Sequence, residues 1–392
     1  MNLMKTSLFA YGFRSNFFLA GVAAMLLVPV WAASFVFGTS IGSGWPPTLW
    51  HAHEMLFGFI AVAIAGFMLT AVPSWTGQKG FAGRPLVALA AVWLSARLLI
   101  ATSSLWPQWV PALADLAFLP FLATLVMLPL LRSKNRNTAL LVVLSALWLT
   151  NLAFHVGLTR LDVPFARHSL LVGIDIVLVL VTVIGGRIVP AFTTAALRQR
   201  GIEGDLKSRT ALTGASIVAM VGIVITDMFW EESRAAGWVA GAAAAFQCAR
   251  LLQWRTRHTL RQPIVWILHL AYAWLPLGLA LKAAALLGGY AIAAFWMHAL
   301  TIGAISTMII GVMTRAALGH TGRPLVVDPL ITVAYVLLMV AALVRVFGFS
   351  LLKLSYPLVI TWAAIFWTTS FALFVGVYTP ILWNPRADGM PG

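Results

Sequence analysis

Charged residues are scarce in this 392-residue sequence, and the scarcity decides the class of protein. Only 9% of the residues are Asp, Glu, Lys or Arg, whereas a typical soluble domain carries about 25%. A soluble chain of this length needs many more charged side chains to cover its surface. The deficit excludes soluble enzymes, disordered tails and secreted disulfide scaffolds. Because 61% of the residues are apolar, the sequence predicts a polytopic membrane protein.

Cysteine is almost absent. The single cysteine, Cys248, excludes an internal disulfide and any cluster of thiolates around a metal ion. Its neighbours in VAGAAAAFQCARLL are apolar, and the sequence therefore predicts a buried, inert thiol.

Acidic residues are also few, with 11 Asp and Glu against 26 Lys and Arg and a net charge of +15. In a soluble protein this excess would indicate nucleic-acid binding. In a membrane protein it follows from the enrichment of basic residues in cytoplasmic loops. The lipid bilayer is therefore an expected partner, and nucleic acid is not.

Apolar stretches long enough to cross a bilayer recur along the whole sequence. A transmembrane helix needs about 20 mostly apolar residues, and a helix satisfies its backbone hydrogen bonds internally in lipid. The sequence predicts an all-α bundle of twelve transmembrane helices in a single integral membrane domain, residues 1–392. The predicted helices cover residues 15–37, 51–73, 85–104, 110–131, 138–158, 167–189, 211–228, 234–254, 263–286, 290–314, 328–348 and 357–381.

The distribution of basic residues predicts the orientation of these helices. With both termini in the cytoplasm, seventeen Lys and Arg residues fall on the cytoplasmic side and five on the opposite side, as the enrichment of basic residues in cytoplasmic loops requires. The N-terminal residues lack the short apolar core and cleavage site of a signal peptide. At the outer helix ends, an aromatic belt is predicted from Trp45, Trp50, Trp106, Trp109 and Trp230.

Histidines are the most informative polar residues in the predicted spans, because a polar side chain in lipid is costly unless it is paired or bound. Five histidines are expected in the outer half of the membrane or at its outer rim: His51, His53, His155, His168 and His298. His269 lies in the inner half, whereas His258 and His320 lie in or beside inner loops.

A single histidine near a helix end is usually an interface residue, but five at one depth predict a buried polar or metal site. Three carboxylates, Glu54, Asp115 and Asp175, are expected at the same depth. Imidazole nitrogens ligate heme iron, copper and zinc. The lack of thiolates favours heme and copper over structural zinc.

A weak internal repeat relates the second, sixth and tenth predicted helices. Glycines follow His53 and His298 at the fifth and thirteenth positions, and His168 at the fifth position only: Gly58, Gly66, Gly303, Gly311 and Gly173. Both longer patterns lead to a GRPL turn, at residues 83–86 and 322–325. The pattern predicts three related four-helix units. The glycines are either close-packing positions between helices or a flat face for a macrocycle.

Several cations lie within or near the predicted spans. Arg97, Arg250 and Lys282 are expected to extend their charged ends to the membrane surface. Arg187 and Arg315, at inner helix ends, either do the same or bind an anionic partner such as a heme propionate or an acidic lipid headgroup.

Three long segments resemble the NnrS family, membrane proteins described as containing heme and copper and associated with the bacterial response to nitric oxide. They are WHAHEMLFGFIAVAIAGFMLTAVPSWTG (50–77), GGRIVPAFT (185–193) and HALTIGAISTMIIGVMTRAALGHTGRP (298–324). NLAFH (151–155) and LHLAYAWLPLGLALK (268–282) fit the same pattern. The resemblance implies a twelve-helix fold, bound heme b and copper, a bacterial inner-membrane location, and resistance to nitrosative stress. With the predicted topology, the histidine cluster lies toward the periplasm.

The resemblance also implies roles for individual residues. The family's histidine motifs fall on His51, His53, His155, His269, His298 and His320. A weaker, fold-level similarity to the catalytic subunits of heme–copper oxidases suggests His53 and His298 as heme ligands, with His269 as a further heme candidate. The copper ligands would come from His51, His155 and His168, and the outer shell or proton path from Glu54, Asp175, Arg187, Arg315 and His320. The helix over 211–228 lacks the paired histidines of an oxidase, so an oxygen-reducing centre is not expected.

Three functions remain open from the sequence. The first is a heme–copper protein that binds or chemically handles nitric oxide or its iron and thiol adducts. The second is a transporter of a metal, heme or small anion, for which Pro120 and Pro276 are candidate helix breaks. The third is a cytochrome that relays electrons from quinol or another electron-transfer partner. Since no nucleophile–base pair or phosphate loop is evident, any enzymatic activity is expected to be heme–copper redox chemistry toward nitric oxide.

Overall fold

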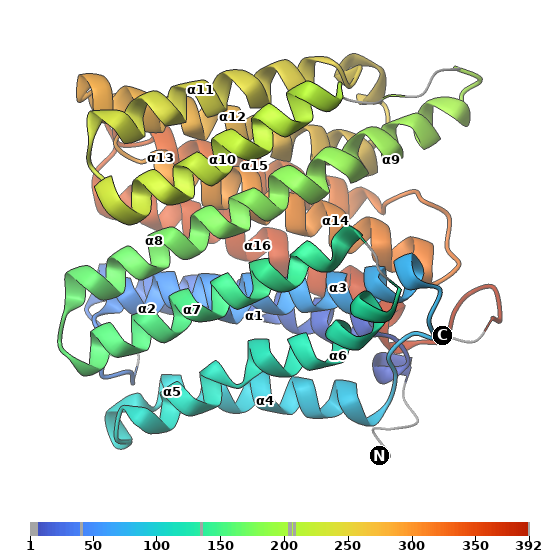
Figure 1. Ribbon diagram of the computed structural model, residues 1–392, viewed down its shortest axis with the longest axis horizontal. Helices are drawn as coiled ribbons and strands as arrows, with labels where there is room; N and C mark the ends of the chain where they lie inside the picture. The colour runs from blue at the N-terminus through green and yellow to red at the C-terminus, as the bar shows by residue number, and fades with distance from the viewer. Residues whose placement is uncertain (1–6, 40–41, 134–135, 203–205, 207–208, 391–392) are drawn as a thin grey trace. The chain divides into compact units, whose positions relative to one another are not determined.

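The computed structural model describes residues 7–39, 42–133, 136–202, 206 and 209–390. Within these residues the protein consists of helices and contains no strand. Twelve helices are long and apolar enough to cross a membrane, and Figure 1 shows them as long ribbons joined by short connections. The predicted fold class is confirmed.

Eight of the twelve spans in the described residues are each a single α-helix. They are α1 (Gly12–Phe37), α4 (Arg84–Ala101), α7 (Ala139–Thr159), α10 (Thr210–Trp230), α11 (Arg234–Leu252), α12 (Pro263–Gly288), α15 (Pro329–Phe347) and α16 (Tyr356–Trp383). Short 3-10 turns, η2 (Ser7–Phe9), η4 (Ser103–Leu105), η5 (Arg136–Thr138) and η7 (Thr256–Thr259), lie between spans or before the first.

The other four spans are composite. Pro47–Thr76 contains α2 (Pro47–His53), η3 (Glu54–Ile60) and α3 (Ala61–Thr76). Trp109–Arg132 contains α5 (Trp109–Leu116) and α6 (Phe118–Arg132). Val163–Arg198 contains α8 (Val163–Leu180), η6 (Val181–Gly185) and α9 (Gly186–Arg198). Ala291–His320 contains η8 (Ala291–Ala293), α13 (Trp296–His298), η9 (Ala299–Ser306) and α14 (Thr307–His320).

The largest differences between predicted and observed spans are at the ends of the sixth and tenth. These helices continue to Arg198 and His320, beyond the predicted ends at 189 and 314. The predictions stop where Pro190 and Arg315 interrupt the apolar run. A helix propagates through its backbone hydrogen bonds, however, and a proline removes only one of them.

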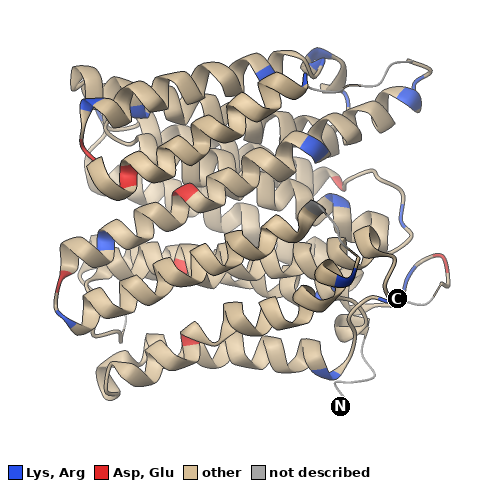
Figure 2. Ribbon diagram, in the orientation of Figure 1, with Lys and Arg blue, Asp and Glu red and all other residues tan. Residues whose placement is uncertain are grey.

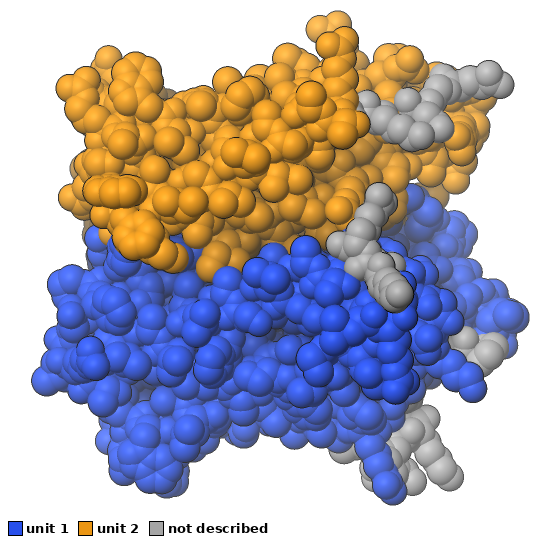
Figure 3. Space-filling model, in the orientation of Figure 1, with its two compact units in different colours: residues 1–173, 313–325, 371–392 blue, residues 174–312, 326–370 orange. Residues whose placement is uncertain are grey.

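The chain divides into two compact units, coloured separately in Figure 3. Unit 1 comprises residues 1–173, 313–325 and 371–392, and unit 2 comprises residues 174–312 and 326–370. Three of the four unit boundaries fall inside α8, α14 and α16, and the fourth, after residue 325, falls in the connection between α14 and α15. The single integral membrane domain stays a prediction.

Charged residues are sparse along the helices, and most of the helical ribbon in Figure 2 is tan, the colour of uncharged residues. Many Lys and Arg residues lie at helix ends and in connections (Figure 2), as expected for membrane spans. Three lysines of the predicted cytoplasmic set, Lys5, Lys134 and Lys207, lie outside the described residues. The orientation of the spans stays a prediction.

Two expectations about exposure are wrong. Cys248 is exposed, because in a membrane protein apolar neighbours also describe a lipid-facing surface. Trp45 and Trp50 are buried, whereas Trp106, Trp109 and Trp230 are exposed. Only the last three have the exposure expected of an aromatic belt, and the ring of Trp45 instead packs inside unit 1.

The second, sixth and tenth spans each contain a π-helical segment, respectively η3, η6 and η9. These are the same three spans that share the glycine pattern. π-Helical turns are rare and occur often at functional sites. Their carbonyls accept side-chain donors: Gly58 from Trp93 at 2.9 Å, Thr182 from Arg250 at 2.8 Å, and Thr301 from Ser306 at 2.8 Å. The shared winding adds a structural feature to the predicted repeat.

The glycines of the repeat lie against side chains of neighbouring segments. A Cβ atom at Gly66 would lie 2.6 Å from the Phe17 ring, and one at Gly173 or Gly311 would lie 2.7 Å from Leu56 or Leu268, respectively. A Cβ at Gly303 would overlap the Trp274 ring, and one at Gly58 would lie 3.1 Å from the Arg97 guanidinium. Of the two interpretations of these glycines, the contacts favour close packing.

Candidate metal site

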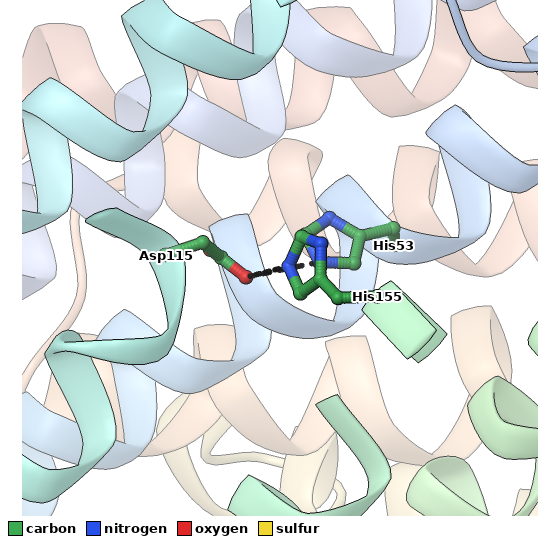
Figure 4. Close-up of side chains that lie close together, drawn as sticks. All are labelled: His53, Asp115 and His155. Atoms are coloured by element: carbon green, nitrogen blue, oxygen red, sulfur yellow. Dashed lines mark hydrogen bonds and ion pairs between the residues drawn. The ribbon is translucent and has the colours of Figure 1, made fainter. Parts of the chain in front are cut away.

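Three buried side chains converge in unit 1: His53 at the end of α2, Asp115 in α5 and His155 near the end of α7. Each offers one ligand atom, and these atoms all lie within 4.8 Å of one another. The exposed fractions of the three residues are 0%, 3% and 4%. Figure 4 shows the Asp115 carboxylate directed at both imidazoles. Two imidazoles and one carboxylate at this spacing are able to hold a metal ion.

The Asp115 carboxylate is the centre of the cluster. Its Oδ2 lies 3.1 Å from His53 Nε2 and 3.0 Å from His155 Nε2. Asn151 donates from Nδ2 to the same oxygen at 2.7 Å, while its Oδ1 lies 3.1 Å from His53 Nε2. Arg97 donates to the other oxygen, Oδ1. These contacts hold the carboxylate in one orientation.

Glu54 sets the tautomer of His53. Its Oε1 accepts a hydrogen bond from Arg97 at 2.5 Å and lies 3.3 Å from His53 Nδ1. Because an ionised carboxylate only accepts, the proton on Nδ1 belongs to His53, and Nε2 faces the oxygens of Asp115 and Asn151. Histidines that ligate metals are commonly oriented by a carboxylate on the other ring nitrogen.

The formal charge of this network leaves room for a cation. Arg97 contributes one positive charge, and Glu54 and Asp115 contribute two negative charges, so neutral imidazoles leave a net charge of −1. All three charged side chains are buried, and an uncompensated buried charge is costly. A proton on an imidazole or a monovalent cation neutralises the network, whereas a divalent cation changes its net charge from −1 to +1.

The π segment η3 begins between the two adjacent site residues, since His53 ends α2 and Glu54 starts η3. Both side chains are buried and in contact with each other. His51 was predicted as a copper ligand, but its ring stacks on Trp31, with 4.1 Å between the ring centroids. Glu54 therefore contacts the imidazole of His53, whereas the imidazole of His51 packs against Trp31.

Aromatic rings surround the imidazoles. The Trp45 ring lies edge-on to His53 and His155, at centroid distances of 5.2 and 5.7 Å. Phe154 stacks on His53 at 4.6 Å, and Phe57 lies 5.0 Å from it. These apolar surfaces lower the local dielectric and strengthen every charge interaction within the cluster.

The other predicted metal ligands are not part of this group. His168 and His298 are half-buried, in α8 and α13. His269 is buried in unit 2 with Thr193 Oγ1 2.7 Å from its Nε2 and Thr256 Oγ1 3.0 Å from its Nδ1. This is the pattern of a hydrogen-bonded core histidine.

The predicted outer-shell residues are also dispersed. Of these, only Glu54 joins the cluster. Asp175 is buried in unit 2, Arg187 is exposed in α9, and Arg315 is buried in α14. His320 is exposed and its ring stacks on Tyr11 with 6.1 Å between centroids.

Sequence reasoning missed Arg97 and Asn151 as site residues. Arg97 was expected to reach the membrane surface, as were Arg250 and Lys282, but all three are buried, and these expectations are wrong. Arg97 binds two carboxylates, Arg250 binds the Thr182 carbonyl, and Lys282 binds Asp227. The sequence did contain a signal for Arg97. A cation in an apolar span, at the same predicted depth as carboxylates in other spans, indicates a buried ion pair.

The fold and the site together define a polytopic, all-helical membrane protein with a buried His–Asp–His group able to hold a metal. The NnrS family model, described as NnrS protein, matches residues 7–386. The chain belongs to the NnrS family, which confirms the resemblance seen in the sequence. None of the curated proteins compared with the chain matches it.

Proposed function

We propose that this protein binds copper at His53, Asp115 and His155 and uses the site to bind or chemically handle nitric oxide in the bacterial response to nitrosative stress. The observation that carries the proposal is the convergence of three buried ligand atoms within 4.8 Å inside a network of net formal charge −1. Copper and nitric oxide come from the NnrS family resemblance. The histidine cluster would face the periplasm, with both termini in the cytoplasm.

The donor set fits copper. Imidazole nitrogens with a carboxylate are ligands that divalent copper accepts, and neither thiolate nor thioether is needed. Bound copper would supply a one-electron redox couple and a coordination position for nitric oxide.

The residues of the chain prepare the site. Glu54 holds the Nδ1 proton of His53 and so leaves Nε2 directed at the cluster. Arg97 and Asn151 hold Asp115, and the rings of Trp45 and Phe154 limit access of water. A site held in this way needs little rearrangement when a cation enters.

Heme b is the second cofactor that the resemblance implies, with His53, His298 and His269 as predicted ligands. An axial ligand presents one ring nitrogen to the iron. Both ring nitrogens of His269 lie within hydrogen-bond distance of threonine hydroxyl groups, so this residue fits a heme poorly, and His53 is assigned to the copper site instead. Heme ligation by these residues stays a prediction.

The test compares the intact purified protein with His155→Ala, and with His258→Ala as a matched control in an exposed loop. We expect metal analysis to find copper in the wild type and the control but not in His155→Ala. The absorption and electron paramagnetic resonance spectra of the wild type should change on addition of nitric oxide. Equal copper content in all three proteins would refute the site.

The same preparation separates the other two functions. A transporter would move metal, heme or a small anion into proteoliposomes without a stably bound chromophore. An electron-transfer cytochrome would show a Soret band that quinol reduces and nitric oxide leaves unchanged. A Soret band lost in both His53→Ala and His298→Ala would support the predicted heme ligands.

A further inference from the structure

Unit 2 contains a second buried cluster of charges, formed by Asp175 in α8, Asp227 in α10 and Lys282 in α12. All three residues have exposed fractions of 1% or less. Lys282 donates to Asp227 Oδ2, and its ammonium lies 4.7 Å from the centroid of the Trp296 ring. Ionisable residues inside membrane spans are rare and commonly form proton relays or ion sites.

Asp175 makes this cluster unusual. Its carboxyl group lies near enough to Asp227 and Lys282 for both to act on it as neighbouring charges. An ionised carboxylate only accepts hydrogen bonds. Among the described residues, neither oxygen of Asp175 nor Oδ1 of Asp227 has a hydrogen-bond donor. A proton between the two carboxyl groups supplies the missing donor.

The charge count gives the same result independently. Two carboxylates and one ammonium have a net charge of −1, and one added proton makes the buried cluster neutral. A metal cation fits less well, because calcium and magnesium take about six or more oxygen ligands and the Lys282 ammonium already lies beside Asp227. The charge and the ligands of the cluster therefore favour one bound proton over a metal cation.

The cluster also has a connection to the end of a helix. Glu231 directly follows α10 and lies four residues beyond Asp227, a spacing that places two side chains on the same helical face. Glu231 is half-buried and acts electrostatically on Asp175. In the sequence, Glu231 lies between Asp227 and the exposed Glu232.

We propose that Asp175 and Asp227 share one exchangeable proton beside Lys282, and that Glu231 transfers this proton between the cluster and water. On release, the O–H bond of the shared carboxyl breaks, and the proton moves to a Glu231 carboxylate oxygen and then to water. Uptake reverses these steps, and no electron moves. Unit 2 thereby contains a proton-binding site that is separate in its residues from the metal site and does not rest on it.

The test is infrared spectroscopy of the intact protein at neutral pH in H2O and D2O, reading the C=O stretch of protonated carboxyl groups. The wild type should show one such band that shifts in D2O. Asp175→Asn and Asp227→Asn should each remove the band, because either leaves one carboxylate for Lys282. Asp162→Asn, the same change at an exposed position, should keep it.

Lys282→Gln gives the opposite result and so does not depend on a loss of folding. Without the ammonium, two buried carboxyl groups need two protons to be neutral, so the band should approximately double. Glu231→Gln should keep the band but slow its exchange into D2O, on the order of 100-fold.

Four outcomes would overturn the proposal. They are no protonated carboxyl band in the wild type, a band retained in both aspartate variants, a band unchanged in Lys282→Gln, and a band that never exchanges into D2O. Exchange at the wild-type rate in Glu231→Gln would refute the transfer role of that residue.

Discussion

Arg97 connects the two carboxylates of the metal site. It donates to Glu54 Oε1 at 2.5 Å and also to Asp115 Oδ1. The guanidinium has five donors in a planar fork, so one side chain is able to satisfy both acids. Its burial depends on this pairing, because an unpaired arginine would extend to the membrane surface.

Replacing Arg97 with Met should strongly destabilise the protein, because Glu54 and Asp115 would remain buried without their cation. Removing one partner of a buried ion pair typically costs about 3–5 kcal/mol. Thermal unfolding of the purified protein measures the effect as a lowered melting temperature. Arg160→Met, at an exposed position, is the control and should unfold like the wild type.

A second substitution distinguishes charge from shape. Adding Glu54→Gln to Arg97→Met removes one of the stranded charges and should recover part of the lost stability. If Arg97→Met unfolds at the wild-type temperature, the ion pair does not stabilise unit 1.

Among the elements, the π segments have the clearest consequence for the site. In η3 the winding changes directly after His53, and α3 then continues to Thr76. Each residue inserted into or removed from a helix rotates the preceding part by about 100° relative to the following part. The winding of η3 therefore determines whether His53 points at Asp115.

Deleting one residue from η3, Met55, should convert the segment to regular α-helix and turn His53 away from Asp115. We expect loss of bound copper, while circular dichroism and a single gel-filtration peak show an intact helical protein. Deletion of the exposed Gln78, in the connection after α3, is the matched control and should retain copper. Wild-type copper content in the Met55 deletion would contradict a role of η3 in positioning His53.

At the scale of the whole molecule, hydrophobicity predicts the number of spans, and the distribution of charge predicts their orientation. The described residues contain twelve helices long and apolar enough to cross a membrane, and an even number of crossings predicts that the two ends of the chain lie on the same side. The seventeen basic residues on one side against five on the other predict that this side is the cytoplasm.

The orientation is testable with reporter fusions. Green fluorescent protein fused after residue 390 should fluoresce, and alkaline phosphatase at the same position should be inactive, because the C-terminus is expected in the cytoplasm. Inserted at the turn between α7 and α8, residues 160–162, the two reporters should give the reverse result. Active phosphatase at the C-terminus would invert the proposed topology.

The helices were predictable because hydropathy acts locally. Each span is a contiguous apolar run, and the bilayer sets its length. The His53–Asp115–His155 group was predictable only in part. The position of each residue along its helix predicted that all three lie at one depth in the membrane. It did not predict which helices are neighbours or which way each side chain points, so His155 and His53 were assigned to different cofactors.

Arg97, Asn151 and Lys282 show why the polar partners were missed. Each lies in a mainly apolar helix, where lipid-facing and buried positions have a similar composition. Cys248 is the opposite case. It was expected to be buried because its neighbours are apolar, but apolar neighbours are also compatible with the exposed position it occupies.

The sequence by itself determined that this chain forms twelve helices long and apolar enough to span a membrane and that it belongs to the NnrS family, because both properties depend on contiguous residues. Only the tertiary structure decided which polar side chains meet. Contacts such as Arg97 with Asp115 or Lys282 with Asp227 join different spans, and the rotation of each helix about its axis selects them. That rotation depends on packing and on the π segments, which hydropathy does not encode.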